Sequence, residues 1–220
     1  MSRVIIFDLD GTLVDSCLIC VNILSDMLFE RGSDHVIDVI GARKYMSRGG
    51  VDMVSALLGS ECRDANAELA DFRARYQTTF TPRESLFPGV SEGLEALRAA
   101  GFTLAICSNK PQNLCDKVLK DTGLDRHFAL VVGGRAGLRP KPHLDLLDVV
   151  LDDLRCAPAD CVFIGDSELD HAVASASGMA FKFVTYGYAE DGWMPDRGDI
   201  YDCFPTMSAS ILTGVVTTNA

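Results

Sequence analysis

Short apolar runs alternate along most of the chain with longer segments in which hydrophobic residues recur at helical spacing. The runs end at glycines or polar clusters, as buried strands do. They predict strands at 4–7, 102–107, 130–132, 161–164 and 180–184. The segments between them predict helices at 91–100, 111–122, 143–154 and 169–177. Short buried strands that alternate with helices form a parallel sheet covered on both faces.

One long segment interrupts this alternation after the first strand. Residues 16–83 carry only helical patterns, beginning with a helix expected at 16–31 that ends at Gly32. We therefore predict an α/β fold in which a doubly wound (Rossmann-like) parallel sheet core carries an inserted all-helical cap domain. The core is expected at 1–15 and 84–220, and the cap at 16–83.

Polar residues stand where three of the predicted strands end. Asp8, Asp10, Gly11 and Thr12 follow the first strand, Ser108 and Asn109 follow the second, and Asp166 and Asp170 follow the fourth. Lys141 precedes the helix at 143–154. Because ligands bind outside the carboxyl ends of the strands in an open α/β sheet, we expect these side chains to converge.

The aspartates among these residues indicate a bound cation. Asp8 and Asp10 lie two apart, so both point to the same side of an extended chain. Burying two like charges is costly unless a cation lies between them. Asp166 and Asp170 would add oxygen ligands of the kind that Mg²⁺ prefers. A single Asp at such a place is more often a helix or turn cap, but capping requires neither the Gly-Thr pair nor Lys141.

The chain resembles the haloacid dehalogenase superfamily in several motifs that occur in the right order. Residues 8–16 (DLDGTLVDS) resemble its first motif, 141–142 (KP) its third, and 165–170 (GDSELD) its fourth. Residues 88–90 (PGV) and 107–111 (CSNKP) resemble the phosphoglycolate phosphatase branch. The resemblance implies a magnesium-dependent phosphatase that hydrolyses a small phosphate monoester through an aspartyl-phosphate intermediate.

The resemblance also implies a role for each motif residue. Asp8 would be the nucleophile, and Asp10 would protonate the leaving oxygen and then activate water. Mg²⁺ would be bound by Asp8, by the backbone carbonyl of Asp10 and by Asp166, with Asp170 as a further ligand or a support of the ligands.

The remaining motif residues would act on the phosphoryl group. Ser108 and Asn109 would donate hydrogen bonds to it, Gly11 and Thr12 would help to position it, and Lys141 would neutralise charge on the nucleophile and the phosphate.

A cationic loop lies between two predicted cap helices. Residues 41–50 contain Arg43, Lys44 and Arg48, in a chain whose net charge is −11. If the loop faces the core site, these cations would favour a substrate with a second anionic group. The alternative is a solvated loop whose charges offset those of nearby aspartates.

The net charge and the cysteine positions indicate which binding partners and which cellular compartment to expect. A net charge of −11 disfavours nucleic acid and acidic membranes as partners, since both require a basic surface. The first apolar run is too short for a secretory signal, and the eight cysteines are scattered within apolar patterns, as reduced core cysteines are. We expect a cytoplasmic protein that acts on a small phosphorylated metabolite. The sequence gives no indication of the oligomeric state.

Four other functions compete with that of a phosphatase. A phosphosugar mutase of the same superfamily stays open. A phospho-accepting receiver domain also uses an acidic pocket, a hydroxyl and a lysine, but it has no helical insert. A dehalogenase is disfavoured by Asp10, and a phosphonate hydrolase would have to use Lys44, the only lysine of the predicted cap.

Overall fold

The computed structural model describes residues 4–196 and 198–216. Its strands are β1 (Val4–Phe7), β2 (Thr103–Pro111), β3 (Leu130–Gly134), β4 (Cys161–Gly165), β5 (Ala180–Val184) and β6 (Asp199–Tyr201). Within the described residues they form one sheet in the order β3-β2-β1-β4-β5-β6, and every pairing is parallel. The predicted α/β fold with a doubly wound sheet is therefore confirmed.

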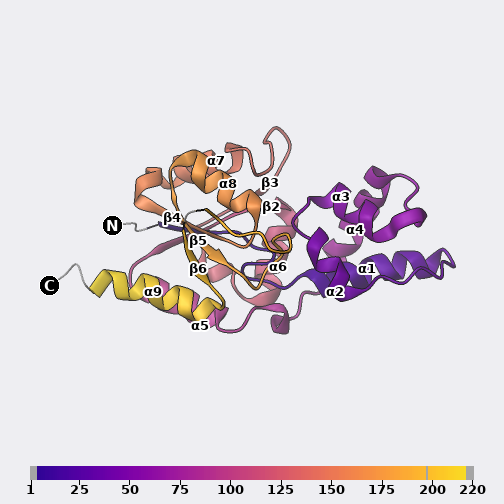
Figure 1. Ribbon diagram of the computed structural model, residues 1–220, viewed down its shortest axis with the longest axis horizontal. Helices are drawn as coiled ribbons and strands as arrows, with labels where there is room; N and C mark the ends of the chain where they lie inside the picture. The colour runs from indigo at the N-terminus through magenta and orange to yellow at the C-terminus, as the bar shows by residue number, and fades with distance from the viewer. Residues whose placement is uncertain (1–3, 197, 217–220) are drawn as a thin grey trace.

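Helices cover both faces of this sheet (Figure 1). One face carries α5 (Val90–Ala99), α6 (Gln112–Thr122) and α9 (Phe204–Val216), and the other carries α7 (Asp145–Leu154) and α8 (Glu168–Ser177). Alternate strand residues supply the two cores, because side chains of a strand point to opposite faces in turn. Ile5 and Phe7 belong to one core, and Val4 and Ile6 belong to the other.

The remaining α-helices lie together beside the sheet (Figure 1). They are α1 (Cys17–Glu30), α2 (Val39–Ala42), α3 (Gly50–Leu58) and α4 (Ala65–Thr78). The Asp38 and Asp64 carboxylates accept hydrogen bonds from backbone N–H groups at the starts of α2 and α4, which caps both helices. We call this group of helices the cap; the domain boundaries at residues 16 and 83 stay a prediction.

Short 3-10 turns link several of these elements. They are η1 (Arg43–Tyr45), η2 (Gly59–Glu61), η3 (Arg83–Ser85), η4 (Asp125–His127) and η5 (Pro158–Asp160). No helix in the described part of the chain is long and apolar enough to cross a bilayer.

Three features differ from the sequence analysis. β2 runs on through Ser108 to Pro111, with an irregular register after Cys107. β6 and α9 were not predicted, and α9 packs on α5 where an added Cβ at Gly93 would lie 2.5 Å from the Phe204 ring. Residues 1–3, 197 and 217–220 of the predicted core lie outside the described residues.

Candidate active site

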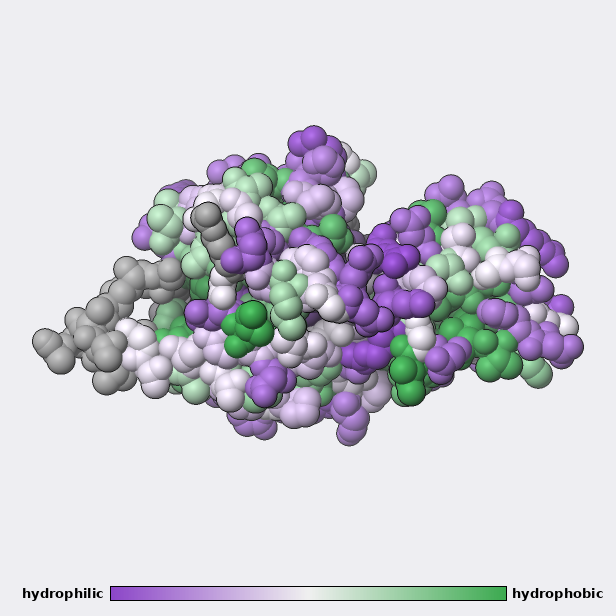
Figure 2. Space-filling model, in the orientation of Figure 1, coloured by the Kyte–Doolittle hydropathy of each residue, from purple (hydrophilic) through white to green (hydrophobic). Residues whose placement is uncertain are grey.

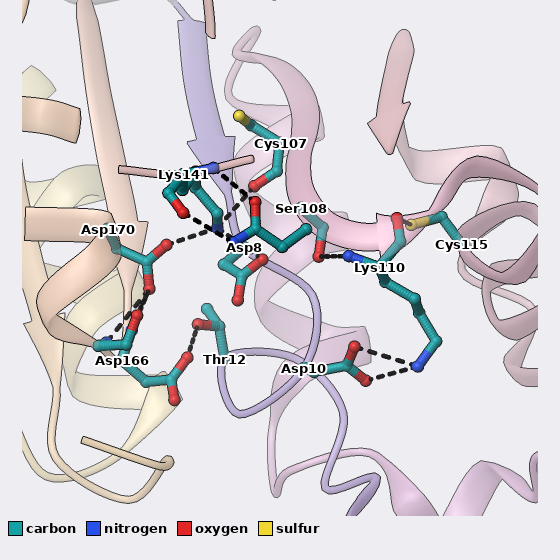
Figure 3. A network of polar contacts seen from close by, with 12 residues as sticks. Asp8, Asp10, Thr12, Cys107, Ser108, Lys110, Cys115, Lys141, Asp166 and Asp170 are labelled. Atoms are coloured by element: carbon teal, nitrogen blue, oxygen red, sulfur yellow. Dashed lines mark hydrogen bonds and ion pairs between the residues drawn. The ribbon is translucent and has the colours of Figure 1, made fainter. Parts of the chain in front are cut away.

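The strand register brings the predicted motif residues together. Phe7, the last residue of β1, pairs with Ile106 of β2 on one side and with Ile164 of β4 on the other. The next residue, Asp8, donates its backbone N–H to the Ile164 carbonyl at 2.9 Å. Residues at the ends of the three strands therefore meet at one edge of the sheet, where the Lys141 ammonium lies between Asp8 and Asp170 (Figure 3).

Lys141 is the centre of a buried polar network. Its Nζ lies 2.9 Å from Asp8 Oδ1 and donates to Asp170 Oδ1 at 2.6 Å and to the Cys107 carbonyl at 3.0 Å. Burial lowers the pKa of Lys141, but the Asp170 and Asp8 carboxylates outweigh burial and raise it. Asn109 holds the lysine backbone, since it accepts from Lys141 N at 2.7 Å and donates to Lys141 O at 3.1 Å. Lys141 is thus a fixed positive charge beside Asp8.

The three carboxylates around Lys141 form a site that fits a divalent cation. Asp8, Asp166 and Asp170 each offer an oxygen within 4.8 Å of the others. Burial raises the pKa of Asp8 to about 6 although Lys141 lowers it, and burial with the neighbouring Asp170 and Asp8 charges raises the pKa of Asp166 well above its usual value. One lysine therefore does not offset these charges, whereas a cation bound to the oxygens would.

The three carboxylates differ in how many hydrogen bonds they accept from other protein groups. Asp170 accepts from Lys141 at one oxygen and from Ser167 at the other, where the hydroxyl lies at 2.7 Å. Asp166 accepts one hydrogen bond at each oxygen, from the Thr12 hydroxyl and from the Tyr188 N–H, both at 2.7 Å. Asp8 Oδ1 accepts no hydrogen bond from a described residue, despite its ion pair with Lys141. Asp8 and Asp166 therefore keep more capacity for a ligand than Asp170 does.

Gly11 and Thr12 support Asp166 in this arrangement. Gly11 has a φ of +86°, and an added Cβ there would lie 2.1 Å from Asp166 Oδ2. A side chain at this position would therefore displace the carboxylate. The Thr12 hydroxyl, which is fully buried, is the group that donates to Asp166 Oδ1. The predicted contact of both residues with a phosphate stays a prediction.

Asp10 is turned toward a lysine that the sequence analysis did not select. Both of its carboxylate oxygens lie 3.1 Å from Lys110 Nζ, away from Asp8 (Figure 3). The Lys110 ammonium also lies 4.2 Å from the centre of the Tyr76 ring, which belongs to α4 of the cap. The available signal was the position of Lys110 directly after Ser108 and Asn109 at a strand end.

A cavity between core and cap opens onto these groups. Its core side includes Asp8, Asp10, Ser108, Asn109, Lys141 and Asp166, and its cap side includes Met46, Met53, Leu69, Phe72 and Arg73. The cavity measures about 120 Å³, which is small beside the pockets that bury drug-sized ligands. Figure 2 shows the outline of the molecule narrowing between the two parts, where hydrophilic residues gather. The cavity suits a small molecule with one strongly polar end.

The cations of the predicted specificity loop are not brought to this cavity. Arg43 donates to Asp15 at 2.8 Å and to the Tyr186 carbonyl at 2.9 Å. Arg48 pairs with Glu190 at 3.3 Å. Lys44 stacks on the Tyr45 ring, and neither it nor the two arginines line the cavity. The charges of the two arginines are thus offset by Asp15 and Glu190, and contact of the loop with a substrate stays a prediction.

The fold and the site together define a class of protein, a doubly wound α/β protein with a cluster of buried carboxylates and a lysine at its strand ends. The chain belongs to the haloacid dehalogenase-like hydrolases, because the family model matches residues 5–184. It is 36% identical to the phosphoglycolate phosphatase of Colwellia psychrerythraea over an alignment that covers 96% of each chain. It is 33% identical to that of Xanthomonas campestris pv. campestris over 187 residues, 84% of each chain.

A solved structure agrees with these relatives. A predicted phosphoglycolate phosphatase from Haemophilus somnus superposes with a TM-score of 0.79 at 26% identity, over 97% of each chain. The chain is thus an enzyme, a phosphatase whose substrate is a small phosphorylated compound. The receiver-domain alternative is set aside by this family membership.

Proposed function

We propose that this phosphatase hydrolyses a small phosphate monoester of the phosphoglycolate type, with Mg²⁺, through a covalent aspartyl-phosphate on Asp8. The observation that carries the proposal is the surroundings of Asp8. Its Oδ1 accepts no hydrogen bond from a described residue, lies 2.9 Å from the Lys141 ammonium, and belongs to a residue that lines the cavity. The printed names of the curated relatives support the substrate type.

In the first step, an oxygen of Asp8 would attack the phosphorus of the bound ester. The bond between phosphorus and the leaving oxygen breaks, and the carboxyl group of Asp10 donates its proton to that oxygen, so the alcohol leaves. Lys141 would stabilise the negative charge that Asp8 and the phosphoryl group share, and Ser108 would donate a hydrogen bond to the phosphoryl oxygens.

In the second step, the Asp10 carboxylate would accept a proton from water. The oxygen of that water attacks the phosphorus, the bond between phosphorus and Asp8 breaks, and inorganic phosphate leaves. Asp10 must leave Lys110 to reach the reacting atoms, since both of its oxygens now contact that lysine.

The residues that would hold Mg²⁺ are Asp8 and Asp166, with the backbone carbonyl of Asp10 and with Asp170 behind them. The bound ion would supply positive charge that offsets the charges of the phosphoryl group and the buried carboxylates. The two raised pKa values described above are the reason to expect a cation in this place.

The Asp8→Asn substitution tests the covalent mechanism. It keeps the shape of the side chain but removes the nucleophile, so we expect kcat to fall by more than about 10⁴-fold. The matched control is Asp116→Asn on the exposed part of α6, which should retain activity. Turnover is measured as release of inorganic phosphate from p-nitrophenyl phosphate.

Mass spectrometry of acid-quenched enzyme should find phosphate on the peptide that contains Asp8. Substantial turnover by a clean Asp8→Asn preparation, or phosphate bound to another residue, would contradict the mechanism. The phosphosugar mutase alternative predicts transfer within a sugar without net release of phosphate, so the same assay separates the two functions.

A further inference from the structure

The cap side of the active-site cavity is mostly apolar, with Ser16 and Ser47 as small polar residues and one charged residue. Its lining includes Met46, Met53, Leu69 and Phe72, and among the described cap residues that line it Arg73 alone carries a charge. The core side, by contrast, holds the carboxylates and the lysine of the proposed phosphatase site. A ligand in the cavity would therefore meet the reacting groups at one end and a single cation at the other.

The sequence of α4 explains why Arg73 faces the cavity. Leu69, Phe72 and Tyr76 are buried and lie on one face of the helix. Arg73 comes four residues after Leu69 and three before Tyr76, so it shares that face. An added Cβ at Gly50 would lie 3.5 Å from Arg73 Nη2. Because Gly50 also lines the cavity, its missing side chain leaves room for the guanidinium there.

Arg73 has no anionic partner in the part of the chain that the structure describes. Four other cap arginines are paired, Arg31 with Glu68, Arg43 with Asp15, Arg48 with Glu190, and Arg75 with Glu30, whereas Arg63, which is also without an ion pair to a described residue, does not line the cavity. Arg73 forms no hydrogen bond or ion pair with any described residue. Its guanidinium has lost part of its water, which lowers its pKa, and no neighbouring charge opposes that effect. The guanidinium is therefore free to pair with an anionic group of a ligand.

Arg73 is also accessible to a ligand. The residue keeps contact with solvent although its guanidinium is partly dehydrated. The three loop cations, by comparison, are engaged by Asp15, Glu190 and Tyr45. Arg73 is therefore the cap cation best placed to contact a substrate whose phosphoryl group lies at Asp8.

We propose that Arg73 binds the carboxylate of a short phosphorylated carboxylic acid and thereby selects this class of substrate. The inference rests on the phosphatase function proposed above. A guanidinium binds a carboxylate through two parallel hydrogen bonds. Its single positive charge balances the single negative charge of a carboxylate. A second phosphate dianion would instead leave excess negative charge against the apolar side chains of the cap.

Two matched esters test this assignment. 2-Phosphoglycolate carries a carboxylate where ethyl phosphate carries a methyl group, so the pair isolates the group that Arg73 would bind. We expect Arg73→Met to lower kcat/KM for 2-phosphoglycolate by about 10- to 100-fold, mainly through KM. The same variant should leave kcat/KM for ethyl phosphate within about twofold. Arg73→Lys, which keeps the charge but not the planar fork, should fall between wild type and Arg73→Met.

Controls separate recognition from folding. Arg63→Met removes another exposed cation of the cap, one that does not line the cavity, and should behave as wild type on both esters. Circular dichroism and the thermal midpoint show whether each variant is folded. Binding is read without turnover by calorimetric titration of 2-phosphoglycolate into Asp8→Asn, alone and combined with Arg73→Met, in the presence of Mg²⁺. Adding Arg73→Met should weaken binding by the same 10- to 100-fold factor.

Each contrary outcome has a distinct meaning. Equal losses on both esters in Arg73→Met, or no loss on either, would overturn the assignment of Arg73. A wild-type enzyme that prefers ethyl phosphate, or that prefers a bisphosphate through Arg73, would overturn the carboxylate class while the phosphatase mechanism stands. If the wild type with Mg²⁺ hydrolyses neither ester and no p-nitrophenyl phosphate, the proposed function itself fails.

Discussion

At the scale of single residues, the site holds more buried negative charge than its own lysine can offset. Lys141 contacts Asp8 and Asp170, but Asp166 has no cation among its described partners. Burial and like-charge neighbours raise the pKa of Asp8 and Asp166. The folded state is therefore under electrostatic strain that a bound divalent cation would relieve.

We accordingly expect Mg²⁺ to stabilise the protein. At a Mg²⁺ concentration about 100 times its Kd, the thermal midpoint of the wild type should rise by about 5–10 °C. Asp166→Asn should remove most of this rise. Asp170→Asn should keep more of it, because Asp170 is already engaged by Lys141 and Ser167. Scanning calorimetry measures the midpoint, with NaCl of equal ionic strength as the control.

Two results would count against a functional metal site. One is a thermal midpoint that does not depend on Mg²⁺ in the wild type. The other is full activity in excess chelator.

At the scale of elements, one partly buried and one exposed ion pair join α1 and α4 of the cap. Arg31, which directly follows α1, forms two hydrogen bonds with the Glu68 carboxylate of α4, one of them at 2.7 Å. Arg75 of α4 reaches back to Glu30 of α1, with both bonds at 2.7 Å. The pKa of Glu68 is lowered, chiefly by its hydrogen bonds from Arg31. The two helices thus depend on ionised carboxylates for part of their contact.

Glu68→Gln should destabilise the cap for this reason. A bidentate, charge-assisted pair is worth about 1–3 kcal/mol when one partner is lost. A lowered folded pKa stabilises the protein above the unfolded pKa and stops doing so as the pH falls through the folded pKa. The difference in free energy of unfolding between wild type and variant should therefore be full at pH 7 and shrink below about pH 4.

Urea unfolding at several pH values measures this difference. Glu61→Gln is the control, since Glu61 forms no ion pair with a described residue of the cap or core. A difference between wild type and Glu68→Gln that does not change with pH would contradict the ion-pair explanation.

At the scale of the whole molecule, the active-site cavity exists only where core and cap meet. Arg43 of the cap bridges this junction, because it pairs with Asp15, donates to the Tyr186 carbonyl and lies 4.9 Å from the centre of the Tyr188 ring. Tyr188 in turn donates to Asp15 and, through its backbone N–H, to Asp166. Arg43 is therefore connected to Asp166 through Asp15 and Tyr188, although it does not line the cavity.

Arg43→Met should consequently act on all substrates alike. A small displacement of the cap relative to the core would lower kcat/KM for 2-phosphoglycolate and ethyl phosphate by a common factor of about ten. The loss of stability should stay below about 1 kcal/mol, because both partners of the ion pair are about one-third exposed. Steady-state kinetics on the two esters measure the factor. If kcat/KM fell for 2-phosphoglycolate alone, Arg43 would instead recognise the second anionic group of the substrate, as the cationic-loop hypothesis states.

The sequence by itself determined the α/β sheet, the identity of the family and the residues that gather around Asp8. Local pattern was sufficient here, because carboxyl ends of parallel strands must meet at one edge of the sheet. Asp8 and Asp166 follow β1 and β4, and Ser108 lies in the last part of β2; these strands are neighbours in the sheet, so the convergence of the three residues was set once the strands were recognised. The helices from α1 to α8 were recognised from the same pattern, since their hydrophobic spacing does not depend on what they pack against.

Tertiary structure alone decided which charged residues are partners and which are free. Arg43, Lys44 and Arg48 form a conspicuous cluster in the sequence, yet their neighbours come from Asp15, Tyr45 and Glu190. In the sequence, Arg73 is indistinguishable from other helix arginines. Only the tertiary structure shows that it lines the same cavity as Asp8, on the cap side.

The last strand and the last helix also depend on tertiary structure and could not be predicted from local pattern. β6 is a short edge strand with exposed residues, and α9 lacks charged residues and carries only a weak amphipathic pattern. Each is defined by what it packs against: β6 by β5, and α9 by α5. Pairings between distant segments cannot be read from local periodicity, because the free energy of a contact depends on which groups the fold brings within reach and how much water it removes from them.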